Sequence, residues 1–319
     1  MSMNVAVIGA GAWGIALSLQ MARTGANVYL WSRKELPNPT NRTLSRLDCV
    51  PLPETITVSN QFPTQADITF LTVPLQHMRS ILPHVSGNSP LIACCKGVET
   101  TSLKFPLEIL EEFYPQREHG ALSGPNFAHE VAKGYPTASV IASKHPELAQ
   151  EWANKLSTST FRLYANHDPI GVEIGGAAKN VFAIAAGLAM GAGLGENARA
   201  SIITRGIAEL SRLSIGLGGE PMTLSGLAGV GDMILTCTGQ GSRNYSLGVE
   251  LGQGKKLQEI LAQRTTVAEG VTTAPALLKR AKQHHVNTPI IEAVTHILNE
   301  EITVQTAQNI LMSRPLGNE

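Results

Sequence analysis

The sequence predicts an α/β fold, with an N-terminal doubly wound sheet followed by an all-α C-terminal domain. In the first half of the 319 residues, short apolar runs alternate with helical patterns. Alternation of this kind is typical of a parallel sheet covered by helices on both faces. After about Pro169 the β-rich runs stop and only helical spacing remains. We therefore expect two domains, 1–168 and 169–319.

The expected strands are continuous apolar runs, which fit strands buried on both sides. In chain order they are Asn4–Gly9, Asn27–Trp31, Ala66–Val73, Pro90–Lys96, Gly120–Gly124, Ala138–Ala142 and Thr160–Leu163. A helix is expected over Trp13–Thr24, because Gly25 follows it and glycine commonly ends helices. Further helices are expected within 170–216 and over Val249–Gln263, Thr272–His284, Ile290–Asn299 and Thr303–Met312.

Composition excludes several classes of protein. The 25 basic residues balance 25 acidic ones, which removes the electrostatic case for nucleic acid or an anionic membrane surface. The most apolar stretch, 181–194, is about 14 residues, short of the ~20 that span a bilayer. Residues 1–4 carry no basic region of a signal peptide. The four cysteines lack metal-site or disulfide spacing, so we expect a cytoplasmic protein with no metal site and no membrane insertion.

A glycine motif follows the first expected strand and opens the first expected helix. Gly9, Gly11 and Gly14 fit G-x-G-x-x-G, the fingerprint of Rossmann-type dinucleotide-binding domains. The first glycine permits the tight turn, the second lets a diphosphate approach the backbone, and the third allows close helix–strand packing. The diphosphate would lie against unpaired N–H groups at the helix N-terminus. The alternative is an ordinary glycine-rich turn between strand and helix.

The end of the second expected strand bears on the choice of dinucleotide. An acidic residue about 20 positions after the motif usually binds the ribose hydroxyls of NAD. Here the strand runs instead into Arg33 and Lys34, and a guanidinium suits the 2′-phosphate of NADP. We expect NADP(H) to be preferred, with NAD(H) retained as an alternative because of Glu35. Arg33 and Lys34 could also simply solvate a loop.

Two lysines are candidates for chemistry on a carbonyl substrate. Lys179 lies within a small, apolar helical stretch, where burial would favour a neutral amine that acts as an acid or base near neutral pH. Lys96 ends an expected strand, and ligands of open α/β sheets bind beyond the carboxyl ends of strands. The competing interpretations are a lysine that reaches out to water and a solvated charge at a strand end.

A glycine-rich stretch in the second half indicates a phosphate site. Asp232 and Thr236 would share one helix face, although Asp232 could instead be a helix cap. Loop 239–244 enters another helix with Ser242 as the expected N-cap. Its loose N–H groups, together with Arg243, could hold a phosphate dianion. A flexible loop with a surface arginine is the alternative.

These residues resemble one family closely, the bacterial-type NAD(P)-dependent glycerol-3-phosphate dehydrogenases. The resemblance covers essentially the whole chain in order. It depends on Gly9–Gly14 with Trp13, on SGPNFA at 123–128, on Lys179 with Asn180, and above all on GLAGVGDMILTCTGQGSR at 226–243. The resemblance implies reversible hydride transfer between NAD(P)H and dihydroxyacetone phosphate, giving sn-glycerol 3-phosphate for phospholipid synthesis.

The resemblance also implies a role for each matching position. It makes Lys179 the catalytic proton acceptor in glycerol phosphate oxidation. The implied substrate-binding residues are Lys96, Gly124, Asn126, Lys179, Asp232, Ser242, Arg243 and Asn244. The implied cofactor-binding residues are Gly9, Gly11, Trp13, Gly14, Arg33, Lys96, Ala128, Arg243, Val267 and Glu269. This chain departs from the family at Asn126, where Ser or Thr is usual, and in a shorter stretch over 34–52.

The expected protein is thus an oxidoreductase with its active site between a dinucleotide-binding domain and a helical domain. Two alternatives stay open. One is another dehydrogenase of this architecture, such as a ketopantoate or phosphogluconate reductase, and the other is a non-catalytic NADP(H)-binding sensor. The expected partner is a small phosphorylated substrate, and a homodimer is left open.

Overall fold

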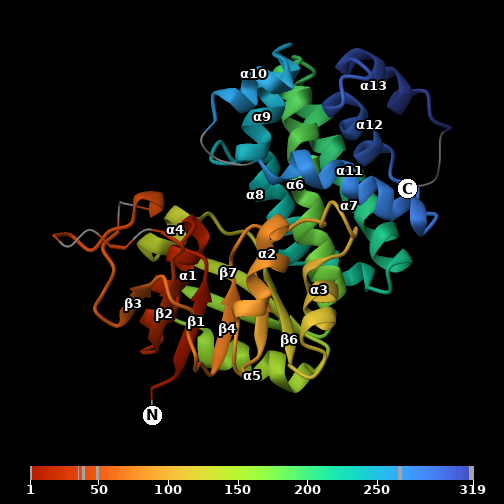
Figure 1. Cartoon of the computed structure of the whole chain (residues 1–319). Coiled ribbons are helices and arrows are strands. Elements are labelled where there is room, and N and C mark those ends of the chain that lie inside the picture. The colour runs from red at the N-terminus through yellow and green to blue at the C-terminus, as the bar shows by residue number, and fades with distance from the viewer. Residues whose placement is uncertain (1, 35, 38–39, 48–49, 265–267, 316–319) are drawn as a thin grey trace. The chain divides into compact units, whose positions relative to one another are not determined.

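The computed structural model describes residues 2–34, 36–37, 40–47, 50–264 and 268–315 (Figure 1). The chain divides into two compact units. The first contains Met1–Glu99 and Lys104–Glu173, and the second contains Thr100–Leu103 and Ile174–Glu319.

The first unit is built on an eight-stranded sheet in the order β3-β2-β1-β4-β5-β6-β7-β8. The strands are β1 (Asn4–Ile8), β2 (Asn27–Trp31), β3 (Ile56–Ser59), β4 (Ile68–Leu71), β5 (Leu91–Ala93), β6 (His119–Ser123), β7 (Thr137–Ser143) and β8 (Phe161–Asn166). The strand order reverses beside β1, so the predicted doubly wound fold is confirmed. Residues 56–59 form a strand that the sequence analysis did not predict, because this run is short and lies among polar residues.

One pair of neighbouring strands departs from the expected parallel arrangement. β6 and β7 are antiparallel, whereas every other pair in the sheet is parallel. A parallel connection needs a crossover long enough to return the chain to the other edge of the sheet. The link between β6 and β7 holds only the short helix α4 (Ala128–Lys133), so β7 runs back beside β6.

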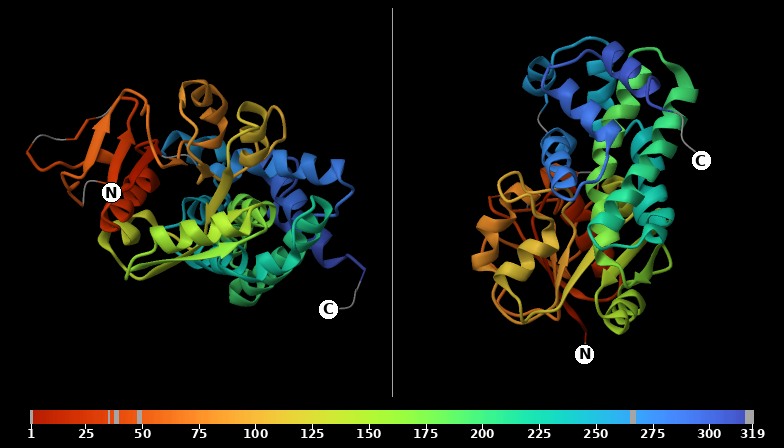
Figure 2. Two further views of the ribbon diagram at one scale, coloured as in Figure 1. Left: turned by 90° about the horizontal axis from the view of Figure 1, so that it is seen from below. Right: turned by 90° about the vertical axis from the view of Figure 1, so that its right-hand side faces the viewer.

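Helices cover both faces of this sheet (Figure 2). α1 (Ala12–Arg23) and α5 (Pro146–Leu156) share a core on one face, where Ile15, Leu17, Trp152 and Leu156 are buried together. The other face carries α2 (Leu75–Ile81) and α3 (Pro106–Phe113), which contact each other. Buried apolar side chains on both sides explain why the strands read as continuous apolar runs.

The second unit is helical. Its elements are most of α6 (Pro169–Gly191), α7 (Gly195–Gly216), a 3₁₀ turn (Pro221–Ser225), a π-helical turn (Leu227–Gly231), α8 (Asp232–Thr238), α9 (Arg243–Gly252), α10 (Leu257–Ala262), α11 (Glu269–Gln283), α12 (Pro289–Leu298) and α13 (Val304–Met312). The helix predicted over Val249–Gln263 is wrong. It is two helices, α9 and α10, because the chain turns at Gly254 with a φ of +89°.

Helix α6 is longer than the apolar stretch noted in the sequence. The helix has 23 residues, and an 18-residue window within it, with a mean hydropathy of 1.3, is long and apolar enough to cross a membrane. However, 89% of that window is buried inside the protein. The apolar surface of α6 is therefore covered by protein, as in a core helix.

Candidate active site

The glycine loop after β1 has the geometry of a diphosphate cradle. Gly9 has a φ of +121°, its N–H donates to the Trp31 oxygen at 3.1 Å, and its oxygen accepts from Thr72 Oγ1 at 2.8 Å. A Cβ on Gly14 would lie 1.8 Å from that same oxygen, whereas one on Gly11 would meet nothing within 4 Å. The open space over Gly11, at a helix N-terminus without a side-chain cap, fits the diphosphate of a dinucleotide.

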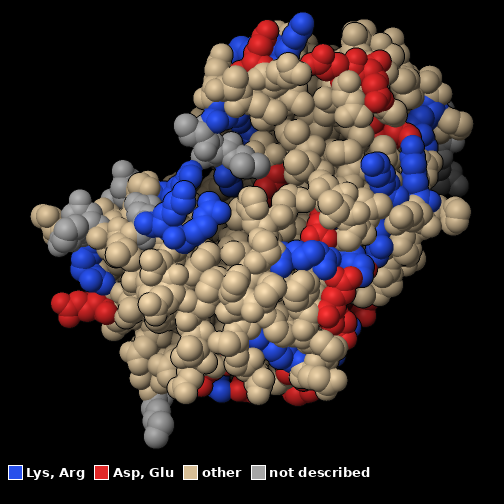
Figure 3. All heavy atoms as spheres, viewed as in Figure 1, with Lys and Arg blue, Asp and Glu red and all other residues tan. Residues whose placement is uncertain are grey.

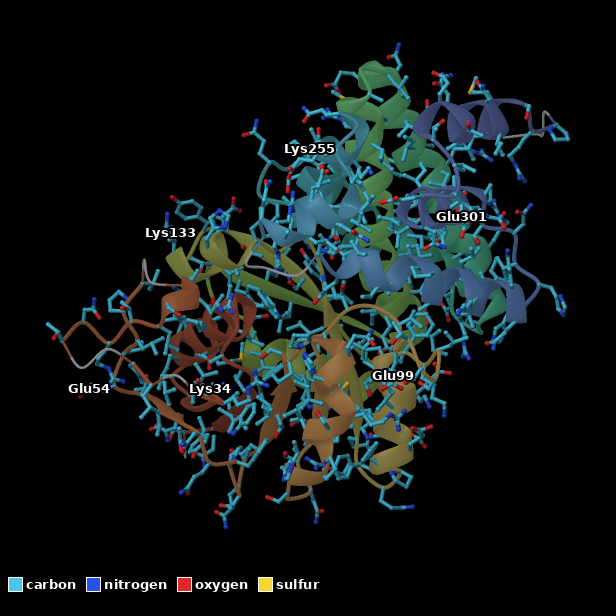
Figure 4. The ribbon with its side chains drawn as sticks, turned by 45° about the horizontal axis from the view of Figure 1, so that its top comes forward. Lys34, Glu54, Glu99, Lys133, Lys255 and Glu301 are labelled. Carbon is cyan, nitrogen blue, oxygen red and sulfur yellow. The ribbon has the colours of Figure 1, made fainter. Side chains whose placement is uncertain are left out.

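The end of β2 lies beside this loop and carries exposed positive charge. Ser32 is buried and its N–H donates to the Ser59 oxygen at 2.8 Å, which holds the strand end in the sheet. Arg33 and Lys34 follow with exposed side chains, and Figure 4 labels Lys34. Their charge fits a phosphorylated ribose better than a plain diol. Glu35, on which the NAD alternative depended, lies outside the described residues.

The loop between β6 and α4 is pinned to β7 at two points. Gly124 has a φ of +148°, and a Cβ there would lie 2.9 Å from the Ser139 Cα atom. Asn126 Oδ1 accepts a hydrogen bond from the buried Ser139 hydroxyl at 2.9 Å. Ala128 then begins α4. The departure at Asn126 is therefore accommodated, because Ser139 fixes the orientation of its amide.

Lys96 lies beyond the end of β5, not within the strand as expected. β5 ends at Ala93, and Lys96 is partly buried in the segment that follows. Burial raises the pKa of the neighbouring Cys94 thiol, while the Lys96 charge and a hydrogen bond with the Trp13 side chain act in the opposite direction. Trp13, at the start of α1, thus contacts the residue that leads to Lys96. Both predicted ligands are at the carboxyl edge of the sheet.

Lys179 lies on α6 and forms a buried ion pair with Asp232 on α8. Its amine donates to Asp232 Oδ1, and Thr236 Oγ1 donates to the same oxygen at 3.3 Å. Asp232 is 0% exposed and Lys179 is 9% exposed. Gly231, not Asp232, occupies the N-cap of α8, so the capping alternative for Asp232 is wrong. A carboxylate without access to water needs this cationic partner.

A buried thiol lies beside this ion pair. Cys237, on the last turn of α8, is fully buried, and burial raises the pKa of its thiol to about 12. The charge of Lys179 lowers that pKa and the charge of Asp232 raises it, so both lie close to the thiol. The Cys237 thiol is therefore neutral and packs as a small apolar group beside the two charged side chains.

The backbones of α6 and α9 approach closely through glycines. Four of them face carbonyl oxygens of the opposite helix: Gly187 and Gly191 on α6, and Gly248 and Gly252 on α9. A Cβ on these residues would lie 2.2, 2.1, 2.3 and 2.4 Å, respectively, from such an oxygen. No other residue type fits this contact. The approach holds the first turn of α9 against α6.

A chain of side-chain amides joins three helices next to Lys179. The Gly270 N–H donates to Asn244 Oδ1 at 2.9 Å, and Asn244 Nδ2 donates to Asn180 Oδ1 at 2.9 Å. Asn180 Nδ2 approaches Glu269 Oε2 at 3.5 Å. The loop is capped as expected, since the Ser242 side chain accepts from Tyr245 N at 3.2 Å. Glu269, Asn244 and the turn carrying Lys179 are thus tied together.

The structure gathers the expected residues into two groups. The first unit holds the glycine loop, Trp13, Arg33, Lys96 and the loop from Gly124 to Ala128. The second holds Lys179, Asp232, Ser242, Arg243, Asn244 and Glu269. Val267 lies outside the described residues, and Arg243 is exposed. Sequence analysis assigned no role to Ser139 or Asn180, although Asn180 directly follows Lys179.

A glycine cradle on a doubly wound sheet, followed by a helical unit with a buried lysine–carboxylate pair, defines the class of two-domain nicotinamide-dependent dehydrogenases. Comparison with known proteins narrows this class. The N-terminal region of the family described as NAD-dependent glycerol-3-phosphate dehydrogenase matches residues 4–149, and the C-terminal region matches residues 168–309. The chain belongs to this family.

Individual relatives agree over their full lengths. The chain is 52% identical over 320 residues to the glycerol-3-phosphate dehydrogenase [NAD(P)+] of Gluconobacter oxydans, covering 99% of this chain and 98% of that one. It is 47% identical to the enzyme of the same name from Acidiphilium cryptum, covering 98% of each. The crystal structure of the Coxiella burnetii glycerol-3-phosphate dehydrogenase has a TM-score of 0.87 and 33% identity, covering 98% of this chain and 99% of that one.

Proposed function

We propose that this protein interconverts dihydroxyacetone phosphate and sn-glycerol 3-phosphate with NADP(H) or NAD(H), and so supplies the glycerol backbone of phospholipids. The observation that carries the proposal is the buried Lys179–Asp232 pair, held on the same helical unit as the Ser242–Asn244 loop. The names of full-length relatives support the same activity.

Lys179 is the proposed proton donor to the ketone oxygen and, in the reverse direction, the acceptor from the alcohol. When bound, the reduced nicotinamide supplies a hydride to the carbonyl carbon. The Asp232 carboxylate favours the protonated form of the Lys179 amine, which is the form that ketone reduction needs. This refines the expectation from burial alone, which favours the neutral amine. Thr236 orients Asp232 through its hydroxyl.

The phosphate of the substrate is assigned to the first turn of α9. Ser242, Arg243 and Asn244 would supply backbone N–H groups, a guanidinium and an amide, which together suit a dianion. Gly124 and Asn126 would contact the rest of the substrate from the first unit. Lys96 would neutralise charge that develops on the ketone oxygen during reduction.

The cofactor is assigned to the first unit, with its diphosphate over Gly9, Gly11 and Gly14. The remaining contacts are assigned to Trp13, Arg33, Lys96, Ala128, Arg243, Val267 and Glu269. The exposed guanidinium of Arg33 supports a preference for NADP(H).

Three further expectations accompany this function. The dinucleotide-binding domain comprises 1–168 and the helical domain 169–319. The protein acts in the cytoplasm on a free phosphorylated metabolite and binds neither nucleic acid nor membrane. The burial of α6 and the zero net charge support this location. The third is a homodimer, which the sequence left open and which the mass of the protein in solution would test.

Purified protein should oxidise NADPH with dihydroxyacetone phosphate and not with ketopantoate, and should not reduce NADP with 6-phosphogluconate. Initial rates at 340 nm measure all three reactions. Turnover with either alternative substrate and none with dihydroxyacetone phosphate would assign the protein to another dehydrogenase of this architecture. Tight NADPH binding without turnover on any of them would indicate the sensor.

A further inference from the structure

An ion pair between a partly exposed arginine and a buried carboxylate lies close to Lys96 in the first unit. Arg79, on α2, holds both carboxylate oxygens of Glu99, with Nε at 3.1 Å from Oε1 and Nη2 at 3.0 Å from Oε2. Glu99 is only 4% exposed. Bidentate arginine–carboxylate pairs are strong and geometrically specific. The segment that carries Glu99 is therefore fixed to α2 with little freedom.

Two more charged groups extend the pair to α3. Arg79 Nη1 donates to Glu112 Oε2 at 2.6 Å, and Lys104 also donates to Glu112. These two cations lower the pKa of the Glu112 carboxyl, which keeps it charged. Basic and acidic side chains meet over α2 and α3 in Figure 3, and Figure 4 labels Glu99 beside these helices. We call Arg79, Glu99, Lys104 and Glu112 the clamp.

Glu99 and Lys104 of the clamp close the loop between them, which begins three residues after Lys96. The Glu99 N–H donates to the Lys104 oxygen at 2.9 Å, and Gln76 Nε2 donates to the Val98 oxygen at 2.9 Å. Val98 is 0% exposed, and Gly97 turns the chain with a φ of +121°. The backbone is thus held at residues 98 and 99, and Gly97 is the one residue between this held segment and Lys96.

We propose that Arg79 and Glu99 are positioning residues for Lys96, and that the clamp fixes where the Lys96 amine lies. The inference rests on the proposed role of Lys96 in binding substrate and cofactor. Neither Arg79 nor Glu99 was singled out by the sequence, and neither needs to touch the substrate. Catalytic groups misplaced by about 1 Å lose large factors in rate.

The test is a double-mutant cycle between Arg79→Gln and Lys96→Ala, measured as kcat/KM for dihydroxyacetone phosphate with NADPH. Arg79→Gln alone should lower kcat/KM by about 10-fold or more, because the clamp acts through a group that contacts substrate. In the Lys96→Ala background the same change should have less than about a 2-fold effect, since the group it positions is gone. Glu112→Gln, which removes a half-exposed partner, should give a smaller loss of the same kind.

Arg117→Gln is the matched control. Arg117 Nε and Nη2 donate to the Ser89 oxygen at 2.9 and 2.7 Å, so this arginine supports the opposite, amino end of β5. Its removal should lower the thermal midpoint as Arg79→Gln does while leaving kcat/KM within about 2-fold of wild type.

Each outcome of the cycle decides the matter. Equal losses from Arg79→Gln in both backgrounds would mean a merely structural role and would overturn the proposal. If Lys96→Ala lowers kcat/KM but Arg79→Gln and Glu112→Gln leave it at the wild-type value, the positioning role of the clamp is wrong and the proposed function stands. If Lys96→Ala itself matches wild type, the role of Lys96 fails first. Should Arg79→Gln not fold, Glu112→Gln takes its place in the cycle.

Discussion

The side-chain amide of Asn244 donates to the Asn180 oxygen at 2.9 Å and so joins α9 to the turn of α6 that carries Lys179. Both asparagines are at most 7% exposed. Buried amides of this kind are costly to leave unpaired, so the pair fixes the separation between the proposed proton donor and the proposed phosphate loop. The close glycine contact between the same two helices also fixes this separation.

Gly248→Ala should separate α9 from α6. The added methyl group would lie 2.3 Å from the Ile184 oxygen, a backbone atom that cannot move away cheaply. We expect a loss of stability of about 1 to 3 kcal/mol and a rise of about 10-fold in KM for dihydroxyacetone phosphate. Thermal unfolding and steady-state kinetics measure the two effects. Ser246→Ala, on the same helix, is the control, and equal behaviour of the two variants would contradict the close-contact argument.

Lys179→Ala should lower kcat by at least about 100-fold, because it removes the proposed proton donor. Binding of NADPH, followed by fluorescence titration, should stay near wild type. Asp232→Asn should also lower kcat, since it removes the carboxylate that holds the buried amine. Thr236→Ser keeps the hydroxyl that donates to Asp232 and serves as the control. Turnover of Lys179→Ala close to wild type would remove this lysine from the mechanism.

Arg33→Ala should weaken the binding of NADPH without weakening the binding of NADH. Loss of a charge-assisted contact with the 2′-phosphate costs about 1.5 to 3 kcal/mol, which corresponds to a rise of about 10-fold to 100-fold in KM for NADPH. Lys155→Ala, an exposed lysine paired with Glu151 on α5, is the control. Equal loss with both cofactors would show that Arg33 does not bind the extra phosphate.

Glu209→Gln should make the free energy of unfolding fall less as the pH rises. Glu209 is 1% exposed and accepts from Ile290 N at 2.6 Å, at the start of α12. Burial raises the pKa of its carboxyl to about 7, despite the backbone hydrogen bonds that lower it. Because the pKa is higher in the folded state than in the unfolded state, the folded state keeps the proton up to a higher pH. Stability from this group is therefore full below about pH 4.5 and is lost as the pH rises to about 7.

The size of this effect is up to about 3 kcal/mol, because each pKa unit corresponds to 1.36 kcal/mol. The neutral amide of Gln keeps an acceptor oxygen for the Ile290 N–H, so the variant should gain thermal stability over wild type between pH 5 and pH 8. Glu292→Gln changes a more exposed carboxyl on α12 and is the control. Differential scanning calorimetry measures both, and a constant difference across this pH range would contradict a raised pKa for Glu209.

Much of the first unit could be predicted because its signals are local. The turn at Gly9 and the charge at Arg33 follow from residue types next to a strand end, and the structure places both at one edge of the sheet. β3 and the break at Gly254 were missed. A run of four residues has too little periodicity, and a left-handed glycine interrupts a helical pattern without changing its composition.

The candidate site could be predicted only in part. Lys179, Asp232 and Thr236 were identified as residues, and the i,i+4 spacing placed the last two on one helix face. The ion pair between Lys179 on α6 and Asp232 on α8 was not predictable, because it joins residues 53 positions apart in the sequence. The Ser139–Asn126 bond and the clamp around Glu99 were missed for the same reason. They connect strands and helices whose neighbours are set by the sheet order.

By itself, the sequence determined the alternation of strands and helices, the glycine cradle and the identity of the charged groups, since these depend on residue types within a few positions of one another. Only the tertiary structure decided which of those groups meet. Asp232 is fully buried and lies against Lys179 because α8 packs on α6. Glu99 is held by Arg79 because α2 lies against the segment that follows β5. Contacts between distant segments depend on packing, which no local pattern encodes.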